Sequence, residues 1–373
     1  MSVSGTVGDG RLFLLPNMPD PAIVKVSLEK FDPSLLDRPA AWLAEGKLVA
    51  IPTDTVYALA ANADNPAAMS RLCALCGRSV EEPLTLLVAD SADVHRFAQV
   101  VPPVAHRLMG RFWPGPLTLI LPRKGGGSVS LRHPANKATL ELIQRSGVPV
   151  AAPSAALPKG TPAGSAEEVA RLFGSGLDAI VDAGLTQGGK PSTVVRCSKS
   201  GFSVVRLGAL GAEALAEGTA RLILFVCLGN TCRSPMAASL MKKALAEHLG
   251  VPVAMLVKNG YDVKSAGTSA VVGDPMSDHA KAVLRELGCE PIQHVSQPTT
   301  ARLMRAADHV FVMNESQRNS TIALCPDAAN RVELLDREGK AVEDPFGGSL
   351  DAYRRTAGIL SKNVNQLLKK VMP

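Results

Sequence analysis

Short apolar runs and longer amphipathic segments alternate through the second half of the chain. Buried strands are predicted for the apolar runs 223–226, 263–266, 309–313 and 332–334. Helices are predicted for the amphipathic segments 235–249, 278–287, 301–306, 314–324 and 350–371. Such regular alternation predicts an α/β domain with a doubly wound, four-stranded parallel sheet.

The first half is patterned less regularly. Strands are predicted at 47–52, 84–88, 148–152, 179–182, 192–195 and 202–206, with another ending at Leu121. Helices are predicted at 35–45, 69–76, 104–112, 137–146 and 167–173. The two kinds of element interleave, which predicts a mixed α/β sheet.

The 373 residues are enough for two domains. We expect a loose Gly/Pro-rich tail at 1–22, one domain at 23–211, a linker at 212–220 and a second domain at 221–373. Aromatic residues make up only 4% of the chain, so both cores must be aliphatic. The net charge of +6 permits an RNA or phosphate partner.

Cysteine usage and hydropathy bear on location. The seven cysteines have no regular spacing, which favours a reducing cytoplasm. No apolar run has the length of a membrane span, and the start lacks a signal-peptide pattern. We therefore expect a cytoplasmic protein without a membrane partner.

The most informative stretch lies between a predicted strand and a predicted helix. It begins at Cys227 and reaches Arg233, with five residues between them. That spacing lets backbone N–H groups curl around one anion, which the guanidinium can clamp. Gly229 and Asn230 tolerate the positive φ of such a curl, and Pro235 fits a first helical turn. A thiolate nucleophile is favoured at a helix N-terminus beside a cation.

A simpler interpretation is a buried structural cysteine with a surface arginine nearby. An isolated pair at this spacing would fit that interpretation well. The strand before the string and the helix after it favour covalent phosphate chemistry instead.

The C-terminal half resembles the low-molecular-weight protein tyrosine phosphatase family over residues 220–372. The resemblance rests on the strings Cys227 to Pro235, Ser265-Ala266-Gly267-Thr268, His294-Val295-Ser296, Ala307-Asp308 and Asp344-Pro345-Phe346-Gly347-Gly348. It implies that Cys227 carries a covalent phosphate, Arg233 and Ser234 assist it, and Asp344 is the acid and base. It also implies phosphate binding by Leu228, Gly229, Asn230, Thr231 and Cys232, with no cofactor and no metal.

Two features indicate the substrate. Thr231 places a hydroxyl in the loop, and Phe346 is followed by two glycines where tyrosine-specific members carry a second aromatic. These resemble the protein-arginine-phosphatase branch, so phosphoarginine on a protein is favoured over phosphotyrosine. Arsenate reduction, on the same fold, would need two further paired cysteines, and Cys289 and Cys325 lie far apart in sequence.

The first half resembles the threonylcarbamoyl-AMP synthase family, the YrdC/Sua5-type domain, over residues 30–210. The resemblance rests on the strings Pro52-Thr53-Asp54-Thr55-Val56-Tyr57, Phe112-Trp113-Pro114-Gly115-Pro116-Leu117-Thr118, Ala152-Pro153-Ser154-Ala155 and Pro191-Ser192-Thr193-Val194-Val195. It implies an open twisted mixed sheet around a cationic pocket. It also implies that ATP with Mg²⁺, L-threonine and bicarbonate react to threonylcarbamoyl-AMP for the t6A modification of tRNA.

The same resemblance assigns binding residues. Thr53, Thr55 and Tyr57 would line the threonine end, whereas the nucleotide end would be lined by Arg78, Arg132, Ser154, Ser192 and Arg206.

Several positions depart from that family's pattern. Cys76 stands where the family carries a lysine, Ala156 where it carries an asparagine, and Arg196 where it carries an aspartate. Loss of a lysine and an amide predicts a weakened synthase. The alternatives are a fully active enzyme with compensation from Arg196 or a nearby lysine (Lys159 or Lys190), or a module that only binds nucleotide, tRNA or double-stranded RNA.

Cys73 and Cys76 form a Cys-x-x-Cys pair on a predicted helix. A redox pair or half of a zinc site is conceivable, but no second pair follows at zinc spacing. We favour two thiols on a buried helix face.

Overall fold

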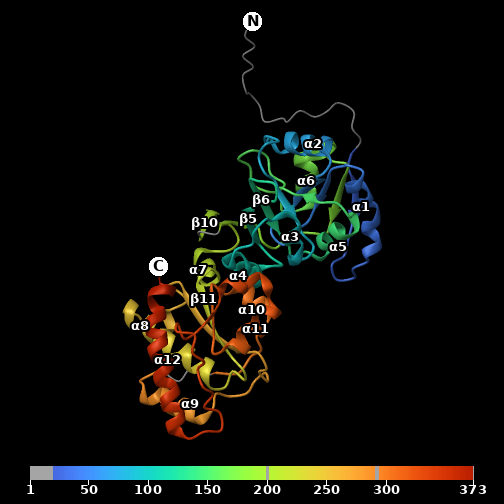
Figure 1. Cartoon of the computed structure of the whole chain (residues 1–373). Coiled ribbons are helices and arrows are strands. Elements are labelled where there is room, and N and C mark those ends of the chain that lie inside the picture. The colour runs from blue at the N-terminus through green and yellow to red at the C-terminus, as the bar shows by residue number, and fades with distance from the viewer. Residues whose placement is uncertain (1–19, 199–200, 290–293, 373) are drawn as a thin grey trace. The chain divides into compact units, whose positions relative to one another are not determined.

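A computed structural model describes residues 20–198, 201–289 and 294–372 (Figure 1). The chain forms two compact units, one of residues 1–102 and 111–212 and the other of residues 103–110 and 213–373. The tail predicted at 1–22 lies almost entirely outside the described residues, and strand β1 begins at its last residue, Ala22. The segment predicted as a linker contains helix α7 (Ala212–Thr219).

The first unit is built on a ten-stranded mixed sheet in the order β1-β8-β2-β3-β7-β4-β6-β5-β9-β10. Its strands are β1 (Ala22–Lys25), β2 (Val49–Ile51), β3 (Ala58–Asn62), β4 (Thr85–Leu87), β5 (Leu117–Pro122), β6 (Ser128–Arg132), β7 (Val150–Ala151), β8 (Ala179–Asp182), β9 (Thr193–Ser198) and β10 (Gly201–Arg206). Parallel pairs such as β4 with β6 stand beside antiparallel pairs such as β5 with β6. The mixed sheet predicted from the sequence is confirmed.

Helices cover both faces of this sheet: α2 (Pro66–Cys76) and α6 (Ala166–Phe173) pack on one face, and α1 (Asp37–Ala44) and α5 (Lys137–Ser146) pack on the other (Figure 1). The chain also forms α3 (Val94–Phe97), α4 (Pro103–Phe112) and short 3-10 turns at Pro33–Leu36, Ser91–Asp93 and Gly174–Gly176, and residues 103–110 of α4 belong to the second unit. Alternate residues of β2 point to opposite faces, so Ala50 packs in the core under α2 and α6 while Val49 and Ile51 pack under α1 and α5. Both cores are mainly aliphatic, as the composition predicts.

Capping residues determine where α2 begins and ends, and Arg78 follows its C-terminal end. The Asn65 side chain accepts hydrogen bonds from the N–H groups of Ala67 and Ala68, and Pro66 occupies the first turn. The helix ends at Gly77, whose φ of +62° is left-handed. Arg78 follows directly, outside the helix.

The second unit contains a four-stranded sheet in the order β12-β11-β13-β14, and all its pairs are parallel. Its strands are β11 (Arg221–Cys227), β12 (Tyr261–Gly267), β13 (His309–Val312) and β14 (Val332–Leu334). Its helices are α7, α8 (Arg233–Leu249), α9 (Asp278–Glu286), α10 (Ala301–Ala306), α11 (Glu315–Leu324) and α12 (Leu350–Val371), with 3-10 turns at Val253–Met255 and Pro326–Arg331. The doubly wound parallel sheet predicted from the sequence is confirmed.

Strand β11 is central and buried on both faces. Ile223 and Phe225 face a core formed with α8, α9 and α12, whereas Leu222 and Leu224 face a second core under α10. The Phe225 and Phe311 rings pack with centroids 5.6 Å apart and so tie β11 to β13. The carboxyl end of β11 is therefore held rigidly where the thiol string begins. Within the described residues, no helix is both long and apolar enough to cross a membrane.

Candidate active site and a second, arginine-lined cavity

The thiol string forms a tight loop between β11 and α8. Asn230 adopts a left-handed φ of +57° at its centre. The loop lies against the end of β12, because a Cβ added at Gly267 would fall 2.4 Å from the carbonyl oxygen of Leu228. Only a glycine at this position leaves room for the loop.

Two polar groups lie within hydrogen-bond distance of the sulfur of Cys227. The backbone N–H of Asn230 donates to the sulfur at 3.2 Å, and the hydroxyl of Ser234 lies 3.0 Å from it. The Asn230 amide donates in turn to the Ser234 hydroxyl at 2.9 Å. The loop thus places a backbone N–H and a hydroxyl group next to the Cys227 sulfur.

The start of α8 is open to an anion. Its N-cap residue, Cys232, makes no capping hydrogen bond with its side chain. Arg233, only 4% exposed, donates to the carbonyl of Val342 at 3.1 Å. Its Nε is buried and has no hydrogen-bond partner among the described residues. A buried donor without a partner is costly, and a phosphate oxygen in the loop would satisfy it.

Asp344, the predicted acid and base, forms an ion pair with Arg233, the predicted cation of the loop, although 111 residues separate them in the sequence. Its side chain is 38% exposed, so the carboxyl group stays accessible from solvent. Phe346 follows two residues later and is exposed.

Three residues outside the loop contact it. The backbone N–H of Gln297, which the sequence did not single out, donates to the side-chain oxygen of Asn230 at 2.9 Å. His294, which the resemblance implies is a residue that orders the loop, bonds through Nε2 to the Asn230 carbonyl at 2.7 Å, and burial lowers its pKa. The hydroxyl of Tyr353, on α12, lies 3.2 Å from the sulfur of Cys232. None of the three lies close in sequence to the loop that it supports.

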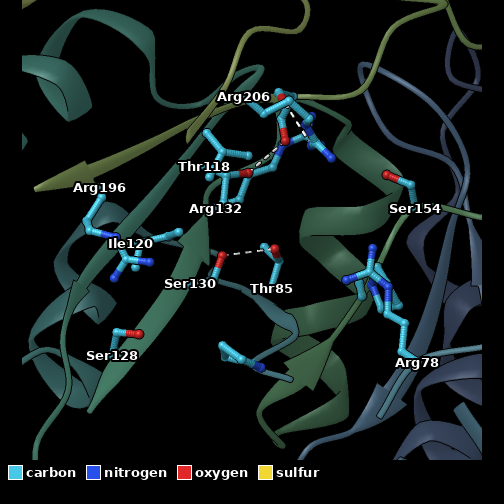
Figure 2. A pocket seen from close by; sticks show the side chains of 15 residues that line it. Arg78, Thr85, Thr118, Ile120, Ser128, Ser130, Arg132, Ser154, Arg196 and Arg206 are labelled. Carbon is cyan, nitrogen blue, oxygen red and sulfur yellow. Dashed lines mark hydrogen bonds between the residues drawn. The ribbon is translucent and has the colours of Figure 1, made fainter. Parts of the chain in front are cut away.

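The first unit contains a cavity of about 190 Å³ (Figure 2). All five residues predicted for the nucleotide end line it: Arg78, Arg132, Ser154, Ser192 and Arg206. The hydroxyls of Thr85 and Ser130 bond to each other at 3.0 Å on its wall. The lining residues include no carboxylate, so the described surroundings of the cavity are strongly cationic.

The residues predicted for the threonine end are not among the lining residues. Thr53, Thr55 and Tyr57 are buried. The hydroxyls of Thr53 and Thr55 lie 2.9 Å apart, and Arg132 donates to Thr55 at 2.9 Å. The Tyr57 hydroxyl donates to the carbonyl of Gly184 at 2.9 Å, and burial raises its pKa. Thr55 therefore contacts the cavity wall through Arg132, and none of the three residues lines the cavity itself.

Cys76 contributes no charge to this cavity. Its thiol is buried at the end of α2, and burial raises its pKa to about 11. Cys73 is also buried, and both thiols are free. No group of three or more His, Cys, Asp or Glu residues within the described part of the chain could hold a metal ion.

The fold and the two sites define a protein with two different units, one with a thiol loop and one with an arginine-lined cavity. Comparison with known families assigns both. Residues 222–372 match the low molecular weight phosphotyrosine protein phosphatase family, and residues 41–208 match the Sua5/YciO/YrdC family, described as telomere recombination. The chain belongs to both families, each over one half.

Curated relatives agree with this division. A protein-arginine-phosphatase of Geobacillus stearothermophilus is 35% identical over 153 residues, 40% of this chain and 95% of its own length. A threonylcarbamoyl-AMP synthase of Pyrococcus abyssi is 38% identical over 187 residues, 48% of this chain. The chain spans about half, 55%, of that synthase. A Mycobacterium tuberculosis relative, provisionally assigned the same synthase name, is 30% identical over 181 residues, 46% of this chain and 83% of its own length.

One solved structure is similar in fold. The crystal structure of P. abyssi Sua5 complexed with L-threonine has a TM-score of 0.50 and 28% identity, covering 66% of this chain and 92% of that one.

Gly267→Ala should displace the thiol loop, because the added methyl would collide with Leu228. We expect phosphate to protect Cys227 from iodoacetamide roughly tenfold less well, measured by mass spectrometry of the Cys227 peptide. Gly358→Ala, in α12 with nothing within 4 Å of the added Cβ, is the matched control and should leave protection unchanged. Equal protection in both variants would contradict the close contact.

His294→Gln should make the second unit less sensitive to acid. Burial lowers the pKa of His294 in the folded state, so the unfolded chain binds more protons below its ordinary value of about 6.5. The contribution of neutral His294 to the free energy of unfolding is therefore fully present above about pH 6.5 and is lost as the pH falls below that value. We expect thermal melting between about pH 7 and pH 5 to show a shallower decline in the variant. Burial also lowers the pKa of His309, so the melting temperature should still fall somewhat with pH in both the native chain and the variant. An identical fall in the two proteins would refute a contribution of His294 to acid sensitivity.

Proposed function

We propose that the second unit is a protein phosphatase that works through a cysteinyl-phosphate and prefers phosphoarginine. The convergence of the Asn230 N–H and the Ser234 hydroxyl on the Cys227 sulfur is the observation that carries this proposal. The unpartnered Nε of Arg233 beside that loop supports it.

The residues suit a two-step displacement. In the first step the Cys227 thiolate attacks phosphorus, the S–P bond forms, and the bond to the leaving nitrogen or oxygen breaks as Asp344 supplies a proton. In the second step water attacks phosphorus, Asp344 takes its proton, and the S–P bond breaks to restore the thiolate. Arg233 stabilises the transferring group throughout, and Ser234 donates to the departing thiolate.

The ion pair between Asp344 and Arg233 bears on how phosphate would bind. A phosphate dianion is the stronger partner for a guanidinium because it carries two negative charges, whereas a carboxylate carries one. Substrate would therefore draw Arg233 into the loop and leave Asp344 available for proton transfer.

Preference for phosphoarginine rests on the space and polarity around the loop. Thr231 is half-buried in the loop, with its hydroxyl 3.6 Å from the sulfur of Cys232. Phe346, 73% exposed, provides one aromatic surface. A guanidinium group can bond to a hydroxyl and stack on one ring, whereas a phenol ring gains from apolar walls. Phosphotyrosine is the second candidate, favoured by the name of the matching family.

Thr231→Ile should shift the preference toward phosphotyrosine. The change replaces a hydroxyl by an apolar branch inside the loop, and we expect the kcat/KM ratio of phosphoarginine to phosphotyrosine peptides to fall about tenfold. Cys227→Ser should abolish turnover of both peptides and serves as the control. An unchanged ratio in the Ile variant would count against phosphoarginine.

We propose that the first unit is a threonylcarbamoyl-AMP synthase domain with weakened turnover. Its arginine-lined cavity supports binding of ATP, while the neutral, buried Cys76 supports loss of turnover. No carboxylate lines the cavity, so Mg²⁺ would be held by the phosphates of ATP itself. L-threonine and bicarbonate are the other substrates, and tRNA or double-stranded RNA is the partner. We also propose a cytoplasmic location and domains at 23–211 and 221–373 joined at 212–220.

Pyrophosphate release tests the weakened synthase. With ATP, Mg²⁺, L-threonine and bicarbonate, we expect little turnover by the native chain and an increase of at least tenfold in Cys76→Lys/Ala156→Asn, since the pair restores a cation and an amide. Turnover by the native chain at the level of the double variant would mean a fully active bifunctional enzyme. RNA binding without any turnover in either protein would favour a binding module.

A further inference from the structure

Arg196 lines the arginine-lined cavity from the side of β9 (Figure 2). The strand register places it beside Ile120 of β5 and Ser203 of β10. Within the described residues the Arg196 side chain has no hydrogen-bond or ion-pair partner. The guanidinium is therefore available to a ligand in the cavity.

The other cavity arginines differ in how far they are neutralised. Arg132 is bound to Asp54 at 2.7 Å and is therefore largely compensated. Arg78 has only Glu82, at 3.9 Å on the exposed surface. Arg206 donates to the carbonyl of Ser192 at 2.9 Å, and its pKa is lowered by burial and then by the charge of Arg78.

Among the described residues, the four cavity arginines have two carboxylate partners, Asp54 on Arg132 and the exposed Glu82 on Arg78. Like charges in such a space repel one another unless an anion binds among them. The hydroxyls of Thr85, Ser130 and Ser192 add uncharged donors to the same wall. A ligand with several negative charges fits this arrangement best.

Resting on the synthase proposal for the first unit, we propose that Arg196 is a phosphate-binding residue that supplies the cation missing at Cys76. It binds one end of a linear polyphosphate, the triphosphate of ATP or a free inorganic polyphosphate. Neither Lys159 nor Lys190 lines the cavity, so Arg196 is the best placed of the three compensating cations considered from the sequence.

The placement favours a chain of phosphates over a single one. In Figure 2, Arg196 and Arg78 lie on opposite sides of the bonded Thr85–Ser130 pair. A triphosphate can contact cations on both sides, whereas the single phosphate of AMP can reach only one side. Arg196 should therefore matter for ATP and for inorganic triphosphate, and little for AMP.

Calorimetric titration of the full chain tests this assignment. The ligands are ATP, AMP and inorganic triphosphate, and the variants are Arg196→Gln, Arg196→Lys and, as a matched control, Arg171→Gln. Arg171 is an exposed arginine of α6 outside the cavity lining. We expect Arg196→Gln to weaken ATP and triphosphate about tenfold and AMP less than twofold, because one charge-assisted contact is lost. The affinity of Arg196→Lys for ATP should lie between those of the native chain and Arg196→Gln, and the affinity of Arg171→Gln should equal that of the native chain.

The outcomes separate the inference from the proposed function. Native binding of ATP that is unchanged in Arg196→Gln overturns the role of Arg196 and leaves the synthase proposal intact. If Arg196→Gln weakens AMP binding as much as ATP binding, the assignment of Arg196 to a polyphosphate is overturned. No binding of any ligand by the native chain overturns both. Triphosphate bound as tightly as ATP identifies free polyphosphate as the ligand, whereas binding of ATP alone identifies the nucleotide; either result, with the expected loss, supports Arg196.

Discussion

The second unit depends on one constraint: a single turn of backbone must join the end of β11 to the start of α8 and hold a backbone N–H against the Cys227 sulfur. The left-handed residue Asn230 makes this possible, because its N–H points to the Cys227 sulfur while its side chain bonds to Ser234. A left-handed residue costs free energy unless its surroundings hold it. Gln297 and His294 supply those contacts from outside the loop.

The rigid base of that turn comes from the sheet. Strand β11 pairs with strands on both sides and packs on both faces, so its carboxyl end cannot shift without disturbing two cores. In doubly wound sheets, ligands bind outside the carboxyl ends of the strands. The loop follows this rule, and the start of α8 adds its open N–H groups to the same point. The sheet topology thus determines where the thiol loop lies.

Much of this could be predicted from sequence, and the failures have physical causes. The strands of the second unit were found because they are apolar runs between amphipathic helices. Strand β3 was missed because it reads Ala-Leu-Ala-Ala-Asn, and alanine has little strand preference. Strand β6 was missed because Ser128 and Ser130 interrupt its apolar pattern. The hydrophobic pattern of a short segment cannot show that its small residues are buried between neighbouring strands.

The candidate site shows the same division between local and distant information. The string from Cys227 to Ser234 is contiguous, so its chemistry could be inferred from its spacing together with the strand before it and the helix after it. The contacts of Gln297, His294 and Tyr353 with the loop join segments more than 60 residues apart, as for His294 and Asn230. For the first unit, resemblance located the cavity residues, but not that Thr53, Thr55 and Tyr57 are buried behind its wall.

The thiol loop and the arginine-lined cavity differ in one respect. Beside the loop lies a carboxyl group, Asp344, that is partly exposed and paired with Arg233. A carboxyl group can transfer a proton to a leaving group, as the proposed phosphatase mechanism requires. The cavity of the first unit is lined by guanidinium and hydroxyl groups without a carboxylate. Such a set can orient phosphates and stabilise their charge, which is the main requirement of phosphoryl transfer chemistry. It has no side chain that exchanges protons near neutral pH, so any proton in a reaction there must move through the substrates or water.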